Sequence, residues 1–215
     1  MFDFILFDFD GTISDSAEGI TRCVQYALRD QSIEAELSEL YCFCGPPLAD
    51  MFQQKYGMSP ELAARAVEKY RERYRETGVY ESRLYPGVDT VLRTLRGAGR
   101  RLAVASSKPE VFVRLLLERF GVLDAFDVLV GAQLDGSFGR KAEVVREALR
   151  RLGVTPEQCG RAVLVGDRFY DVNGAHEAGI ACIGAGYGYA EPGELQRTGA
   201  DFIADTPEDL LPLLL

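Results

Sequence analysis

Short apolar runs alternate with stretches of helical periodicity along most of the chain. The first run, FDFILF at residues 2–7, is too short for a buried helix and rich in aromatic and β-branched residues, so it predicts an interior strand of a parallel sheet. Further runs predict strands at 102–105, 128–130, 162–165, 180–183 and 202–204. Helical patterns separate these runs. The alternation predicts an α/β fold built on a doubly wound, Rossmann-like parallel sheet.

Residues 15–85 follow a different pattern, which is helical and contains no predicted strand. Apolar residues recur at helical spacing, as over 48–56, and Ser59 before Pro60 is a typical N-cap followed by a first-position proline. We therefore expect an all-helical cap domain inserted into the α/β core. The predicted boundaries are 1–14 and 86–215 for the catalytic core and 15–85 for the cap.

Composition and charge exclude several classes of protein and of binding partner. An apolar share of 47% over 215 residues suits a packed core with a smaller domain. The formal net charge of -9 argues against nucleic acid as a partner. No stretch approaches the ~20 apolar residues of a membrane span, and the acids in the first run argue against a signal peptide. Five cysteines at irregular positions indicate reduced thiols and a cytoplasmic protein.

Polar residues with catalytic potential lie where predicted strands end or helices begin, which is where α/β sheets bind their ligands. They are Asp8, Asp10, Ser106, Ser107, Lys141, Asp167 and Asp171. Together they suit phosphoryl transfer. A carboxylate such as Asp8 can act as the nucleophile and form an aspartyl-phosphate. Asp8 and Asp167 supply oxygen ligands of the kind that Mg²⁺ prefers. Asp10 is placed to protonate the leaving alcohol and later to activate water.

The same pattern offers groups for an anionic substrate. Ser106, Ser107 and the amides that open the following helix suit phosphate oxygens, because helix N-termini present free N–H groups. Lys141 adds positive charge beside a carboxylate that attacks an anion, and Lys108 is the alternative cation. Asp171 is either a helix cap or a metal-linked residue.

Four motifs, in order, resemble those of the haloacid dehalogenase superfamily. DFDGTISDS at 8–16 resembles its first motif, Ser106 its second, Lys141 its third and GDRFYD at 166–171 its fourth. The match spans essentially the whole chain, and the helical insertion resembles a C1-type cap of the phosphoglycolate-phosphatase-like subgroup. The resemblance implies that Asp8, the backbone carbonyl of Asp10 and Asp167 hold Mg²⁺. Gly11 and Thr12, within the first motif, join Ser106, Ser107 and Lys141 as expected phosphate-binding residues.

We therefore expect a Mg²⁺-dependent phosphatase that hydrolyses a small phosphorylated metabolite through an aspartyl-phosphate. The alternatives are a phosphosugar mutase of the β-phosphoglucomutase type and a 5′-nucleotidase. A non-catalytic receiver domain combines similar residues, but it is shorter and lacks an inserted helical domain. The segment 45–48, Gly-Pro-Pro-Leu, is either a helix break or a substrate-selecting part of the cap, and the glycine-rich stretch around Tyr187 and Tyr189 is predicted to be a turn.

Overall fold

The computed structural model describes residues 1–135 and 137–215. The chain divides into two compact units, which are described separately. The core unit comprises Met1–Ser14 and Leu84–Leu215, and the helical unit comprises Asp15–Arg83.

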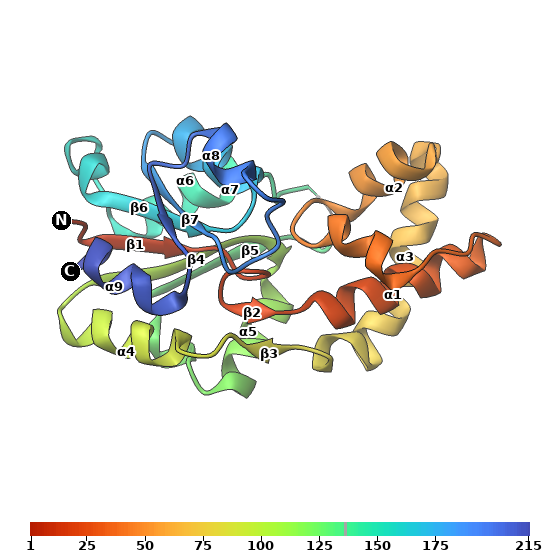
Figure 1. Ribbon diagram of the computed structural model, residues 1–215, viewed down its shortest axis with the longest axis horizontal. Helices are drawn as coiled ribbons and strands as arrows, with labels where there is room; N and C mark the ends of the chain where they lie inside the picture. The colour runs from red at the N-terminus through yellow and green to blue at the C-terminus, as the bar shows by residue number, and fades with distance from the viewer. Residues whose placement is uncertain (136) are drawn as a thin grey trace. The chain divides into compact units, whose positions relative to one another are not determined.

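The core unit is built on a six-stranded sheet in the order β5-β4-β1-β6-β7-β8, visible in Figure 1. Neighbouring strands are parallel throughout. The strands are β1 (Phe4–Phe7), β4 (Arg101–Pro109), β5 (Val128–Ala132), β6 (Ala162–Gly166), β7 (Ala181–Ala185) and β8 (Phe202–Ala204). All six predicted strands are present, and the predicted parallel α/β sheet is confirmed.

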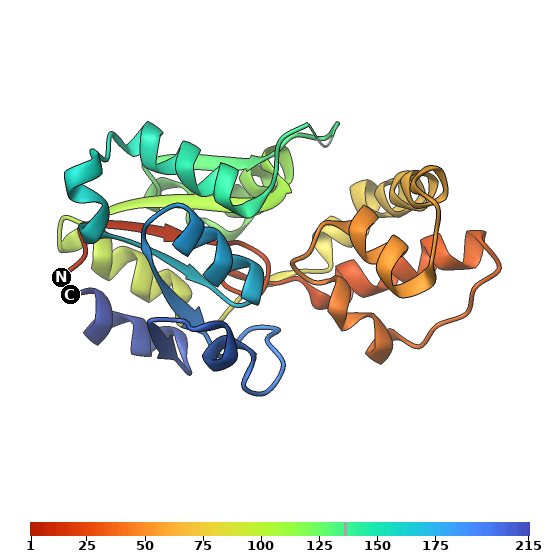
Figure 2. The ribbon, with the colours of Figure 1, turned by 90° about the horizontal axis from the view of Figure 1, so that it is seen from above.

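Helices cover both faces of this sheet, as Figures 1 and 2 show. Val144, Val172 and Leu164 belong to one buried cluster that joins α6 and α7 to the strands. The helices of the core unit are α4 (Val88–Gly97), α5 (Glu110–Phe120), α6 (Lys141–Leu152), α7 (Phe169–Glu177), α8 (Glu194–Thr198) and α9 (Leu210–Leu214), with short 3₁₀ turns η3 (Leu123–Ala125), η4 (Pro156–Arg161) and η5 (Pro207–Asp209). No helix among the described residues has the length and apolarity needed to cross a bilayer.

The register of the central strands brings three chain segments to the same edge of the sheet. Phe7, the last residue of β1, pairs with Val104 of β4 on one side and Val165 of β6 on the other. The residues that follow these three positions therefore lie side by side at this edge. This edge is where the candidate residues of the first, second and fourth motifs meet.

Strand β4 is longer than the sequence predicts. It continues to Pro109, so Ser106 and Ser107 lie inside the strand instead of in a loop before the helix. The register shifts between Ala105 and Pro109, which pair with Val130 and Ala132 of β5. A β-bulge of this kind takes up the extra residues and re-aims the side chains within it.

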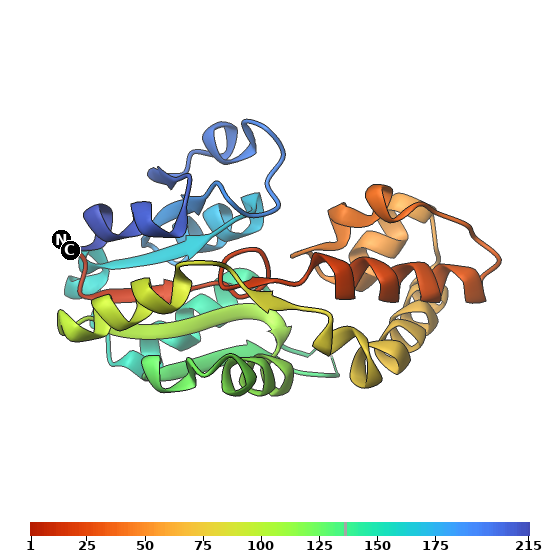
Figure 3. The same ribbon diagram turned by 60° about the horizontal axis from the view of Figure 1, so that its bottom comes forward.

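The helical unit contains α1 (Ala17–Asp30), α2 (Leu48–Tyr56) and α3 (Pro60–Glu76), with 3₁₀ turns η1 (Leu37–Phe43) and η2 (Gly78–Tyr80). Helices α1 and α3 pack together, as Figure 3 shows. The prediction that this segment has no strand is wrong at its two ends, where β2 (Ser14–Asp15) and β3 (Arg83–Leu84) form a two-stranded sheet. These extended segments satisfy backbone groups by pairing with each other, which a pattern of side chains does not reveal.

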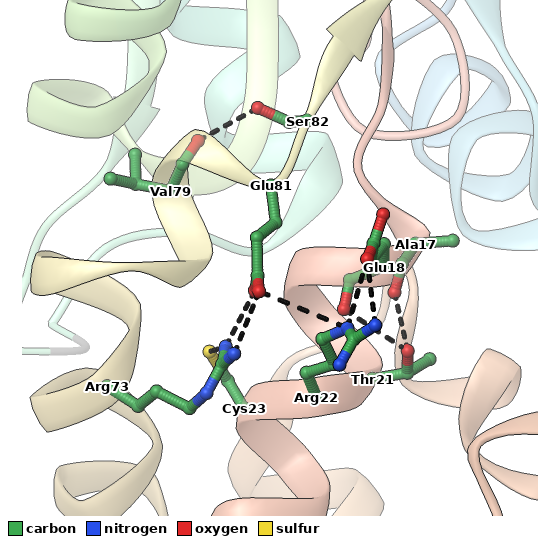
Figure 4. Close-up of polar contacts among 9 residues, drawn as sticks. All are labelled: Ala17, Glu18, Thr21, Arg22, Cys23, Arg73, Val79, Glu81 and Ser82. Carbon is green, nitrogen blue, oxygen red and sulfur yellow. Dashed lines mark hydrogen bonds and ion pairs between the residues drawn. The ribbon is translucent and has the colours of Figure 1, made fainter.

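Glu81, near the end of the helical unit, is the centre of a polar network shown in Figure 4. Arg73 of α3 donates to both of its carboxylate oxygens, at 2.7 and 2.9 Å. The same guanidinium lies 3.2 Å from the Cys23 sulfur of α1. The hydrogen bonds from Arg73 hold the pKa of Glu81 below its ordinary value of 4.5. The network therefore ties the end of the unit to both long helices.

We predict that Glu81→Gln lowers the free energy of unfolding by about 1–3 kcal/mol at pH 7, because it leaves the half-buried Arg73 without its charged partner. Since folding lowers the pKa of Glu81, its stabilising effect is present above pH 4.5 and is lost as the pH falls through the folded-state value. Urea titrations at pH 7 and below pH 4 measure both effects. Glu68→Gln, which affects an exposed pair with Arg71, is the matched control and should cost at most about 0.5 kcal/mol. Equal losses for the two variants would contradict the assignment.

Candidate active site

Asp8 follows directly after β1 and is 4% exposed. Its backbone N–H donates to the Val165 carbonyl at 2.8 Å, which holds it against the end of β6. Its Oδ1 lies 2.6 Å from Nζ of Lys141, the first residue of α6. That ammonium also lies 2.7 Å from Asp171 Oδ1 and donates to the Ala105 carbonyl at 3.2 Å. Lys141 therefore joins the residue after β1 and the middle of β4 to the start of α7.

Asp167 follows β6 and has no exposed surface. Its Oδ1 accepts a hydrogen bond from the Thr12 hydroxyl at 3.1 Å, and its Oδ2 accepts one from the Tyr189 N–H at 2.8 Å. Asp171, in the first turn of α7, accepts the Arg168 N–H at 2.9 Å through Oδ2. Asp171 thus accepts the N–H of the N-cap residue Arg168 with one oxygen and contacts Lys141 with the other, and its metal-linked role stays a prediction.

Asp8, Asp167 and Asp171 each offer an oxygen to one group whose members lie within 4.8 Å of one another. Burial, together with the charges of Asp171 and Asp8, raises the pKa of Asp167. Burial acts to lower the pKa of the Lys141 ammonium, but the two carboxylates beside it hold that pKa above its ordinary value. Three buried carboxylates with one ammonium leave an excess of negative charge. The donor set, all carboxylate oxygens, fits a hard divalent cation such as Mg²⁺.

The side chain of Asp10 points to a different partner. Both of its oxygens lie 2.9 Å from Nζ of Lys108, and both side chains are nearly buried, at 11% and 6% exposure. The two candidate lysines are therefore divided: Lys141 contacts Asp8, and Lys108 contacts Asp10. The carboxylate cluster does not include the Asp10 side chain. That Asp10 binds the metal through its backbone carbonyl stays a prediction.

The expected phosphate-binding residues lie at the same edge. Ser106 is buried and Ser107 half-buried, and the Ser106 Oγ accepts the Lys108 N–H at 3.3 Å, so its own proton can be donated elsewhere. The N–H groups of Gly11 and Thr12 bond within their own turn, to Ser14 and Phe9. The phosphate-binding role of Gly11 and Thr12 stays a prediction, and their observed contacts are with Asp167 and the turn.

Gly11 is required by its position. Its φ is +86°, and an added Cβ would lie 2.1 Å from an Asp167 oxygen. Any side chain here would push against the buried carboxylate and strain the backbone. Glycine at this position therefore lets the first-motif turn approach the end of β6.

The stretch after β7, predicted to be only a turn, is part of the site. The Tyr187 hydroxyl donates to the Thr12 carbonyl at 3.1 Å, and the Tyr189 N–H holds Asp167. A Cβ added to Gly188 would lie 2.3 Å from the Asp167 Cβ and 2.5 Å from the Gly11 carbonyl oxygen. Alternating glycines were the available signal, because they mark close backbone approach as well as turns.

A second contact missed in the sequence holds this stretch to the fourth motif. Glu194, at the start of α8, accepts hydrogen bonds from the Arg168 side chain and the Phe169 N–H, both at 2.9 Å. Arg168 and Glu194 are buried. Burial acts to raise the pKa of Glu194, but its hydrogen bonds, first that from Arg168, hold it below its ordinary value. The pair fixes the loop that follows Asp167.

Comparisons of the sequence and the structure with known proteins agree on one protein family. Residues 5–185 match the family model of the haloacid dehalogenase-like hydrolases. A 5′-nucleotidase of Pseudomonas aeruginosa is 45% identical over 193 residues, covering 89% of this chain and 86% of the relative. The tyrosine-protein kinase PtkA of Mycobacterium tuberculosis is 37% identical over 200 residues, covering 93% of this chain and 67% of the relative. The crystal structure of a predicted phosphatase from Clostridium acetobutylicum has a TM-score of 0.93 at 38% identity, covering 98% of this chain and 96% of that one.

We predict that Mg²⁺ raises the melting temperature by about 3–6 °C at ten times its Kd, because it offsets the repulsion among the buried carboxylates. Asp167→Asn should reduce this shift to less than about 1 °C while keeping an acceptor oxygen for one of the two hydrogen bonds. Thermal melts with Mg²⁺ and with excess chelator measure it. Asp124→Asn, a change of the same kind at an exposed position of the core unit, is the control and should keep the full shift. An undiminished shift in Asp167→Asn would exclude this carboxylate as a ligand.

Proposed function

The chain belongs to the haloacid dehalogenase-like hydrolases and is a phosphoric monoester hydrolase, and from this premise we propose that it cleaves a small-molecule phosphate monoester with Mg²⁺ through an aspartyl-phosphate on Asp8. One observation carries the proposal. A buried carboxylate at the end of the central strand lies 2.6 Å from the Lys141 ammonium and in one group with Asp167 and Asp171. This arrangement holds a carboxylate ready to attack an anion.

The two half-reactions use the two acids of the first motif differently. In the first, an Asp8 oxygen bonds to phosphorus, the ester P–O bond breaks, and Asp10 gives its proton to the leaving alcohol. In the second, Asp10 takes a proton from water, the hydroxyl bonds to phosphorus, and phosphate leaves while Asp8 regains its carboxylate.

The remaining groups of the site orient the reactants. Lys141 keeps Asp8 in place and offsets negative charge, and Ser106 donates to a phosphate oxygen. Asp8, Asp167 and the Asp10 carbonyl would hold Mg²⁺, which would neutralise part of the negative charge at the site. Asp171 orients Lys141 through their 2.7 Å contact.

The helical unit is, in this proposal, the cap that selects the substrate, and residues 45–48 belong to it. The expected partner is a small phosphorylated metabolite. The five cysteines are thiols outside any disulfide, which supports a reducing, cytoplasmic location.

We predict that Asp8→Asn lowers the rate of phosphate release by about four orders of magnitude or more, because no phosphoenzyme can form. Asp10→Asn should still form the phosphoenzyme from p-nitrophenyl phosphate, whose leaving group needs little protonation, and should slow its hydrolysis by about 10²–10⁴-fold. Rapid quench with labelled substrate separates the two steps. Full activity in Asp8→Asn, or in excess chelator, would exclude the proposed mechanism.

A 5′-nucleotide is the second candidate substrate, because the Pseudomonas aeruginosa relative, 45% identical, is a 5′-nucleotidase. We predict that a screen of phosphate release over nucleoside monophosphates, sugar phosphates and phosphoglycolate gives one class with kcat/KM at least about tenfold above the others, since about 1.4 kcal/mol of differential binding suffices. A long-lived phosphoenzyme without phosphate release would favour a mutase. Phosphate that remains on a protein tyrosine would favour the activity named for PtkA.

A further inference from the structure

We propose that Lys108 is a positioning residue for Asp10 and that it couples the orientation of this acid to the phosphate-binding segment at Ser106. The inference rests on the proposed function, in which Asp10 transfers protons. Beyond the four motifs, it gives a separate role to a lysine that the sequence offered only as an alternative cation to Lys141.

The geometry of the contact fixes the carboxylate. Lys108 donates to both Asp10 oxygens at equal distances of 2.9 Å. Two hydrogen bonds from one ammonium oppose rotation of the carboxylate, whereas a single bond would leave it free to turn about that contact. The Lys108 ammonium also lies 5.7 Å from the ring centroid of Phe9, which is fully buried. The Phe9 ring therefore gives the Lys108 ammonium a second contact besides Asp10.

Charge balance explains why Asp10 needs a lysine of its own. A nearly buried carboxylate without a cation or hydrogen-bond donors is costly. Lys141 is already engaged by Asp8 and Asp171. The chain has four lysines, and the other two, Lys55 and Lys69, belong to the helical unit. Within the core unit, Lys108 is therefore the lysine assigned to Asp10.

The link to Ser106 comes from the bulge in β4. Ser106 and Lys108 are both buried, while Ser107 between them is half-buried. The Lys108 N–H donates to the Ser106 Oγ at 3.3 Å, which leaves the serine proton for a phosphate oxygen. One short segment thus sets the position of the phosphate ligand and the orientation of the acid.

This role has a kinetic signature that a phosphate-binding lysine lacks. Protonation by Asp10 matters for an alkyl phosphate, whose leaving alkoxide is strongly basic, and matters little for p-nitrophenyl phosphate. A displaced Asp10 therefore lowers kcat/KM for alkyl esters selectively, since kcat/KM reports the steps up to phosphoenzyme formation. A lost phosphate contact would lower kcat/KM for both kinds of ester by the same factor.

The test compares Lys108→Met, Lys108→Arg and Asp10→Asn on p-nitrophenyl phosphate and on the best alkyl phosphate from the substrate screen. We expect Lys108→Met to lower kcat/KM by about 10–100-fold on the alkyl ester and by less than about threefold on the aryl ester. Lys108→Arg, which also offers two N–H donors, should restore kcat/KM on the alkyl ester to within about fivefold of the value for the unsubstituted protein. Lys69→Met, in the helical unit, is the matched control and should change neither value.

The double variant Asp10→Asn/Lys108→Met supplies an independent reading. If Lys108 acts through Asp10, the kcat/KM of the double variant on the alkyl ester should lie no more than about threefold below that of Asp10→Asn alone. The double variant also removes both charges of the buried pair together, so it can be measured even if Lys108→Met alone fails to fold. Additive losses, or equal losses on the two esters, would overturn the inference.

The outcomes separate this inference from the proposed function. An active Asp8→Asn variant would overturn the proposed function and this inference with it. A leaving-group difference in Asp10→Asn without one in a folded Lys108→Met would overturn the role of Lys108 alone and leave the phosphatase mechanism intact. The absence of that difference in Asp10→Asn would remove Asp10 from proton transfer and overturn the role of Lys108 too.

Discussion

The burial of four carboxylates at one edge of a parallel sheet is the constraint on which this site depends. As whole residues, Asp8, Asp10, Asp167 and Asp171 are each at most 8% exposed. Carboxylates this close repel one another strongly where water is scarce. Two lysines, Lys108 of β4 and Lys141 of α6, contact them and offset part of this repulsion. Two ammonium groups against four carboxylates leave negative charge uncompensated. The same imbalance that opposes burial of these carboxylates fits a bound cation, so the proposed function and the stability of the site depend on the same charges.

The elements around the site follow from this requirement. Asp8, in register with the end of β6, needs rigid neighbours, which a central strand provides. Asp167 is enclosed by two backbone segments that approach within contact distance at Gly11 and Gly188. The buried Arg168–Glu194 pair holds the second of these segments. Each contact comes from a different part of the chain, so the geometry of the carboxylates depends on the folding of the whole core unit.

Much of the fold can be predicted from the sequence because its signals are local. Apolar runs mark all six strands of the main sheet, and Ser59 with Pro60 marks the start of α3, where Ser59 is the N-cap. The extension of β4 depends on pairing with β5, and the pairing of β2 with β3 joins residues about seventy positions apart in the chain. The candidate acids and lysines can also be named from sequence, since they follow predicted strands or begin a helix. Which lysine contacts which acid depends on the tertiary structure, and the spacing of these residues in the sequence does not predict the pairing.

The division of the lysines also explains how two acids, two residues apart, can do different work. If one ammonium served both, Asp8 and Asp10 would share an environment and compete for it. Instead, Asp8 lies with Asp171 beside Lys141, in the cluster that fits a cation, while the Asp10 side chain is held by Lys108 on the bulged segment of β4. In the proposed mechanism, the carboxylate within the cluster attacks phosphorus, and the one held apart from it transfers protons. The separate partners, more than the acids themselves, make the pair chemically unequal.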